Sequence, residues 1–145
     1  MPVSLLDVNI LVALAWPPQQ HHAVVRQWFA TRAPHGWATC ALTQNGFLRT
    51  MLNPALKTSL NAESVIALLE SSTADVHHSR WTEEFGIPAM LRPFAAHLRG
   101  HKQVTDAYLV ALAVRHGGIL VTLDRGAAAL AGAAGYAGSV ELIGA

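Results

Sequence analysis

The uninterrupted apolar run at residues 119–123, Ile-Leu-Val-Thr-Leu, sets strong limits on the fold of this chain. A strand that is apolar on both of its faces is typical of a parallel sheet that helices cover on both sides. Other strand-length segments at 3–6, 37–40 and 139–143 alternate with segments of helical periodicity. This alternation predicts an α/β fold, a three-layer α/β/α sandwich around a mostly parallel central sheet.

The expected helices lie between these strands, and Pro or Gly residues end most of them. We expect helices at residues 8–16, 20–32, 43–52, 62–71, 88–98 and 104–116, with a small one in the Ala- and Gly-rich segment 126–138. A further strand is expected at 75–78, mainly because the alternation requires one there. Asn61 should cap the helix at 62–71. The buried face of that helix is expected to comprise Val65, Ile66, Leu68 and Leu69.

The composition fits a folded domain. Hydrophobic residues make up 52% of the 145 residues and charged residues only 13%, against about 25% in average proteins, so intrinsic disorder is excluded. We expect a single domain over residues 1–145. No apolar segment reaches the ~20 residues of a membrane-spanning helix, and residues 1–7 lack the basic region of a signal peptide. We therefore expect a soluble, cytoplasmic protein that does not contact a membrane.

Only nine carboxylates occur in the chain, and three of them fall at one predicted edge of the sheet. Asp7 and Asp124 each follow a predicted strand. Asp106 lies near the start of the helix at 104–116, which must begin at that edge because the chain then returns through the strand at 119–123. Sites in open α/β sheets lie at the carboxyl ends of the strands.

Two of these three aspartates also have a structural alternative. Asp106 and Asp124, taken singly, are more often explained by contact with a helix N-terminus. No such role is evident for Asp7, which lies between Leu6 and Val8 in the most apolar segment of the chain. The remaining acids are expected to be solvated or capping charges, namely Glu63, Glu70, Glu83, Glu84 and Glu141, with Asp75 left unassigned.

Keeping several ionised carboxylates close together is unfavourable in free energy unless a cation neutralises them, because each raises the proton affinity of the others. Ligands that are all oxygen favour Mg²⁺ or Mn²⁺ over zinc. Such a site can activate water and stabilise charge in phosphodiester hydrolysis. Four neighbouring residues could orient ligands or water or contact a phosphate, and each has an ordinary turn, cap or surface role as its alternative: Asn9, Thr105, Thr122 and Arg125.

Three segments of this chain, in order, resemble the motifs of the PIN domain family. They are Leu-Leu-Asp-Val-Asn-Ile-Leu at 5–11, Thr-Asp-Ala-Tyr-Leu-Val-Ala-Leu-Ala at 105–113, and Thr-Leu-Asp-Arg-Gly at 122–126. Within that family the chain looks most like the VapC-type toxins of bacterial toxin–antitoxin pairs. The resemblance covers nearly the whole chain, and it is specific because three motifs recur in order.

The resemblance implies a metal-dependent endoribonuclease that cleaves RNA such as tRNA or rRNA and that a VapB-type antitoxin neutralises. It assigns Asp7, Asp106 and Asp124 to the metal, with Mg²⁺ or Mn²⁺ as the cofactor. Gln44 stands where the family has a further glutamate, and we expect it to position water or a phosphate. We also expect a homodimer, the commonest oligomer.

Two other functions remain open on the sequence. Because Gln44 removes a negative charge, the chain could be a catalytically degenerate PIN domain that only binds protein or RNA. A phosphoacceptor signalling domain has a similar acidic pocket, but Lys57 and Lys102 both fall in or before helices. Zinc is disfavoured, because the adjacent histidines at 21–22 and 77–78 diverge in direction. Cys40 is expected to fill a strand position in the core.

Overall fold

The computed structural model describes residues 1–144, so the last residue of the expected domain, Ala145, lies outside the described residues. Five strands form one sheet in the order β3-β2-β1-β4-β5, and every pairing is parallel. The strands are β1 (Ser4–Leu6), β2 (Trp37–Cys40), β3 (His78–Trp81), β4 (Ile119–Thr122) and β5 (Val140–Leu142). The predicted parallel sheet is confirmed.

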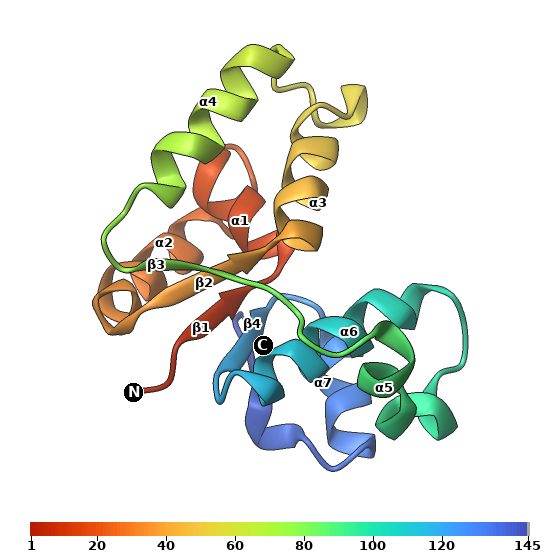
Figure 1. Ribbon diagram of the computed structural model, residues 1–145. Coiled ribbons are helices and arrows are strands. Elements are labelled where there is room, and N and C mark those ends of the chain that lie inside the picture. The colour runs from red at the N-terminus through yellow and green to blue at the C-terminus, as the bar shows by residue number, and fades with distance from the viewer. Residues whose placement is uncertain (145) are drawn as a thin grey trace.

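Helices cover both faces of the sheet (Figure 1). One layer contains α1 (Val8–Ala15), α2 (His22–Arg32), α3 (Ala41–Met51) and α4 (Ala62–Thr73). The other contains α5 (Ile87–Leu91), α6 (Lys102–Arg115) and α7 (Arg125–Ala133). Short 3₁₀ turns occur at Ala33–His35, Pro54–Leu56, Arg92–His97 and Ala137–Ser139. Among residues 1–144, no helix is long and apolar enough to cross a membrane.

The pleat of the central strands divides the core into two clusters. Leu5 of β1 and Leu120 of β4 are paired in the sheet and face the layer of α6. Leu6 and Val121 are the next pair and face the layer of α1. Because side chains alternate between faces, the residues that follow, Asp7 and Thr122, return to the α6 side at the carboxyl edge.

The third strand lies three residues later than its predicted position at 75–78. The Asp75 carboxylate accepts a hydrogen bond from Trp37 Nε1 at 2.8 Å and another from the His77 amide at 3.2 Å. Asp75 thereby closes a turn, and the strand begins at His78, which pairs with Trp37. The prediction used the alternation of elements, which gives no information on this register.

Two predicted helices also differ from the structure. The helix expected at 88–98 is α-helical only over Ile87–Leu91 and continues as the 3₁₀ turn Arg92–His97. Pro93 accounts for the change, because proline has no amide hydrogen for an α-helical bond. In α4, Asn61 caps the helix as predicted, with its Oδ1 accepting from the Ser64 amide at 2.8 Å. Ile66, however, is 52% exposed and does not belong to the buried face.

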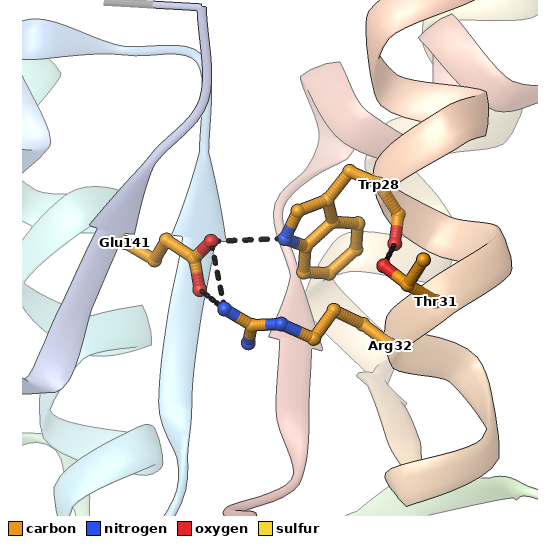
Figure 2. Close-up of polar contacts among 4 residues, drawn as sticks. All are labelled: Trp28, Thr31, Arg32 and Glu141. Carbon is orange, nitrogen blue, oxygen red and sulfur yellow. Dashed lines mark hydrogen bonds and ion pairs between the residues drawn. The ribbon is translucent and has the colours of Figure 1, made fainter.

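Glu141 links the edge strand β5 to α2 by hydrogen bonds and an ion pair (Figure 2). It is therefore not the solvated or capping charge that the sequence suggested. Its Oε2 accepts hydrogen bonds from Trp28 Nε1 at 2.9 Å and from the Arg32 guanidinium at 3.2 Å. Its Oε1 forms an ion pair with the same guanidinium at 3.0 Å. Arg32 also lies over the Trp28 ring, 5.7 Å from its centroid. Charge-assisted bonds of this kind are stronger than neutral ones and fix the position of β5.

Candidate metal centre

Asp7 lies at the carboxyl end of β1 and is 7% exposed. Its Oδ1 accepts from the Val8 amide at 2.7 Å, which makes Asp7 the N-cap of α1. Its Oδ2 accepts from the Thr122 hydroxyl of the neighbouring strand at 2.7 Å. Asp7 therefore does have a helix-capping role, contrary to the expectation from its apolar neighbours. Each oxygen keeps a further lone pair, so capping does not prevent metal binding.

The Asn9 side chain forms hydrogen bonds that connect the end of β1 with the end of β4. Its Nδ2 donates to Thr122 Oγ1 at 3.2 Å and lies 3.5 Å from Asp7 Oδ2. Its Oδ1 accepts from the Leu123 amide at 3.1 Å. Asn9 and Thr122 thus fix the Asp7 carboxylate, as their positions beside the aspartates suggested.

Asp124 follows β4 and caps α7, with Oδ1 accepting from the Gly126 amide at 2.8 Å. The Asp124 amide donates to Thr122 Oγ1 at 3.0 Å, so one threonine hydroxyl contacts both aspartate positions. The structural alternative for Asp124 is therefore confirmed, while its other oxygen has no hydrogen-bond partner within residues 1–144. Arg125, the next residue, is exposed at the first position of α7.

Asp106 lies in α6 on the same side of the sheet. Burial raises its pKa from the ordinary 3.8 to about 6, with further contributions from the charges of Asp124 and Asp7. Burial also raises the pKa of Asp7, and the charge of Asp124 raises it further. The hydrogen bonds from Thr122 and Val8 lower the pKa, but burial has the larger effect. The three aspartates therefore interact electrostatically at one edge of the sheet.

The donor chemistry of these residues fits a hard divalent cation. All three are carboxylates, and a bound cation would offset both the burial of Asp106 as a charged group and its repulsion by Asp124 and Asp7, which together raise its pKa. Within residues 1–144, no three His, Cys, Asp or Glu side chains lie close enough together to hold one ion as they stand.

Gln44 lies in the first turn of α3 and is hydrogen-bonded to β2. Its Nε2 donates to the buried Thr39 hydroxyl at 2.9 Å, and that hydroxyl lies 2.8 Å from His78 Nε2. Cys40 packs in the cluster beside α6. Because side chains alternate along a strand, Thr39 faces the opposite layer, which contains α1 and α3, whereas Asp7 faces α6. The Gln44 amide nitrogen is thus directed to the other face of the sheet.

His78 belongs to the same hydrogen-bonded group as Gln44 and Thr39. Burial lowers the pKa of His78, while the Thr73 backbone and the Asp75 charge act in the opposite direction. The Thr39 oxygen accepts from the Gln44 amide, and Gln44 Oε1 has no hydrogen-bond partner within residues 1–144. Sequence reasoning missed Thr39 and His78, because their pairing depends on the register of β2 and β3.

Asp106→Asn is expected to stabilise the metal-free protein at pH 7.5. Because the folded pKa of Asp106 lies above its ordinary value, the folded protein binds more protons between about pH 4 and 6, and stability falls as pH rises through that window. Asp106 is only half-buried, so after discounting for solvent screening we expect a gain of about 1 kcal/mol, or about 4 °C in Tm. The gain should vanish at pH 4. Thermal unfolding in EDTA measures it, and a lower Tm for the variant at pH 7.5 contradicts this assignment.

Comparison with known families and sequences agrees on one family. The PIN domain model matches residues 4–133. Ribonuclease VapC39 of Mycobacterium tuberculosis is 38% identical over 141 residues, which cover 97% of this chain and 99% of that relative. Ribonuclease VapC38 of the same organism is 41% identical over 130 residues, covering 89% of this chain and 90% of the relative.

Solved structures support the fold. PAE2754 from Pyrobaculum aerophilum superposes with a TM-score of 0.58 at 19% identity, covering 89% of this chain and 79% of that one. FitAB bound to an IR36 DNA fragment contains a chain that superposes with a TM-score of 0.57 at 20% identity, with 90% and 91% of the two chains covered. These identities are low, so the likeness concerns the arrangement of strands and helices.

Proposed function

We propose, on the premise that this chain belongs to the PIN domain family, that it is a metal-dependent endoribonuclease and the toxin of a toxin–antitoxin pair. The observation that carries the proposal is the electrostatic coupling of Asp7, Asp106 and Asp124 at the carboxyl edge of the sheet. Relatives that share 38% to 41% of their residues with this chain are named ribonucleases. The family membership and the acidic edge support the same activity.

Asp7, Asp106 and Asp124 would hold Mg²⁺ or Mn²⁺ through carboxylate oxygens. A bound ion would supply Lewis acidity for phosphodiester hydrolysis, where it would activate water and offset the negative charge that develops on the phosphoryl oxygens. Asn9 and Thr122 keep the Asp7 carboxylate in one orientation. The raised pKa of Asp106 means that it must lose a proton before it binds metal, so activity should fall as pH drops through about 6.

Two further residues are proposed to contact the RNA or the attacking water. Gln44, held through its amide nitrogen by Thr39, offers its Oε1 to position water. Arg125 follows Asp124 and is exposed, so its guanidinium can pair with a backbone phosphate of the RNA.

The substrate proposed is structured RNA, such as tRNA or rRNA, in the cytoplasm. The partner proposed is a VapB-type antitoxin, because the relatives at 38% to 41% identity carry the name VapC, which the toxins of VapB–VapC pairs share. We also propose a homodimer, the commonest form of oligomer.

Cleavage of structured RNA by the purified protein tests the proposal. Incubation with Mn²⁺ should shorten tRNA or rRNA fragments at discrete positions, and EDTA should stop the reaction. Cleavage that continues unchanged in EDTA would contradict a metal-dependent mechanism.

Two observations favour a second function, that of a degenerate PIN domain that binds protein or RNA without cutting. Gln44 stands where the family resemblance implies a glutamate, so the site has one negative charge fewer. Within residues 1–144, no three acidic, His or Cys side chains are already gathered around one point. Such a module would bind its partner but show no affinity for Mn²⁺, which separates it from the ribonuclease.

A further inference from the structure

A cleft of about 580 Å³ opens between the start of α3, the segment that leads into α5, and the first turns of α6. Its volume lies in the range of sites that accept small organic groups. Three of its aliphatic side chains are more than 40% exposed, Leu42 at 41%, Ile87 at 45% and Val104 at 42%. Clustered apolar surface of this kind marks a place where a ligand or partner binds.

The cleft adjoins the candidate metal centre. Thr105 lines it, and the next residue of α6 is Asp106, whose charge interacts with those of Asp7 and Asp124. Side chains of successive helix residues point about 100° apart. The first turn of α6 therefore contributes Thr105 to the cleft and Asp106 to the candidate metal centre. The other wall begins at Ala41, directly after β2. β2 is the neighbour of β1 (Figure 1), and Asp7 directly follows β1.

The polar groups of the cleft suit a ligand without negative charge. No Lys or Arg is among the described residues that line it, so the cleft has no cation to bind a phosphate. The Asn45 carboxamide and the Thr105 hydroxyl are exposed and can form hydrogen bonds with a ligand. The Tyr108 ring adds an aromatic surface, and the Glu83 carboxylate adds an acceptor.

We propose that this cleft binds one unpaired nucleobase of the RNA beside the phosphate that is cleaved. Leu42, Ile87 and Val104 contact the faces of the base, and Asn45 and Thr105 form hydrogen bonds with its edge. Glu83 accepts a hydrogen bond from an exocyclic amino group, which cytosine, adenine and guanine carry and uracil lacks, so that uracil can offer only its N3–H. Proteins that read RNA sequence commonly take unpaired bases in this manner. The inference rests on the proposed ribonuclease function.

Binding of short single-stranded RNA in EDTA tests the base site without cleavage. Fluorescence anisotropy compares ten-nucleotide oligo(C), oligo(U) and an abasic ribose-phosphate oligomer. Wild-type protein should bind oligo(C) more tightly than oligo(U), and the abasic oligomer most weakly. Asn45→Ala should weaken oligo(C) binding about tenfold and leave abasic binding unchanged, because loss of one base contact typically has this magnitude. Gln27→Ala, which removes an exposed carboxamide from α2, is the matched control and should change neither.

Glu83→Gln tests the preference for an amino group and should bring the affinities for oligo(C) and oligo(U) together. The proposal is wrong if Asn45→Ala binds oligo(C) within twofold of wild type. It is also overturned if Val104→Ser converts a dimer to a monomer in light scattering while RNA binding stays unchanged, since the cleft would then be an interface between copies. Asn45-dependent binding without any cleavage in Mn²⁺ would support the base site and contradict the ribonuclease function, so the two failures are distinguishable.

Discussion

Asp7→Asn is expected to reduce RNA cleavage about 10³-fold or more at pH 7.5 in Mn²⁺. Metal-ion catalysis contributes several kcal/mol to the stabilisation of the transition state, and each 1.36 kcal/mol is tenfold in rate. Asparagine is also a good N-cap, and Asp7 is the N-cap of α1, so the fold should persist. Single-turnover cleavage of a labelled tRNA measures the loss.

Asp75→Asn is the matched control for this substitution. It makes the same chemical change at an aspartate before β3, where the asparagine oxygen can still accept from Trp37 Nε1. Its cleavage rate should remain within about twofold of wild type, because Asp75 precedes β3 and so lies at the edge of the parallel sheet opposite to Asp7 and Asp124. Equal rates for Asp7→Asn and wild type would exclude Asp7 from the reaction.

Gly118→Ala is expected to produce the largest loss of stability, about 3 kcal/mol or about 10 °C in Tm, at the upper end of the range for overpacking. A Cβ at this buried position would lie 2.5 Å from Trp81 Cη2 and 2.6 Å from the Val3 backbone oxygen. Trp81 is stacked on His116 with centroids 4.3 Å apart, and the backbone of Val3 leads into β1. Neither contact can relax without moving the sheet.

Gly132→Ala provides the control for that prediction. Gly132 lies in α7, and beyond the backbone of its own helix no atom lies within 4 Å of the position that an alanine Cβ would occupy. Alanine should therefore raise stability by about 0.5–1 kcal/mol through helix propensity. Thermal and urea unfolding of both variants measure the contrast. Equal Tm values for the two variants would show that the close packing around Gly118 does not hold in solution.

The sequence predicted the parts of this fold that depend on local pattern. The apolar runs before Asp7 and Asp124 indicated two strands of a parallel sheet, and the chain direction placed Asp106 at the same edge. β1 and β4 are neighbours, and the Thr122–Asp7 hydrogen bond joins their ends. The coupling of the three carboxylates therefore follows from strand ends, which sequence periodicity locates well.

The features that sequence reasoning missed join residues far apart in the chain. Glu141 binds Trp28, 113 residues away, and Thr39 pairs with His78, 39 residues away. The position of β3 depends on how Asp75 meets Trp37. Each of these contacts follows from the packing of neighbouring elements, and no local periodicity or propensity indicates it.

Titration of Mn²⁺ into the metal-free protein by calorimetry tests the central claim most directly. Wild-type protein should bind Mn²⁺ at pH 7.5, with an affinity that falls as pH drops through about 6, because protons compete for Asp106. Asp7→Asn should lose most of this binding, and Asp75→Asn should retain it. Absence of Mn²⁺ binding to folded wild-type protein at pH 7.5 would contradict the metal centre and identify the chain as a binding module.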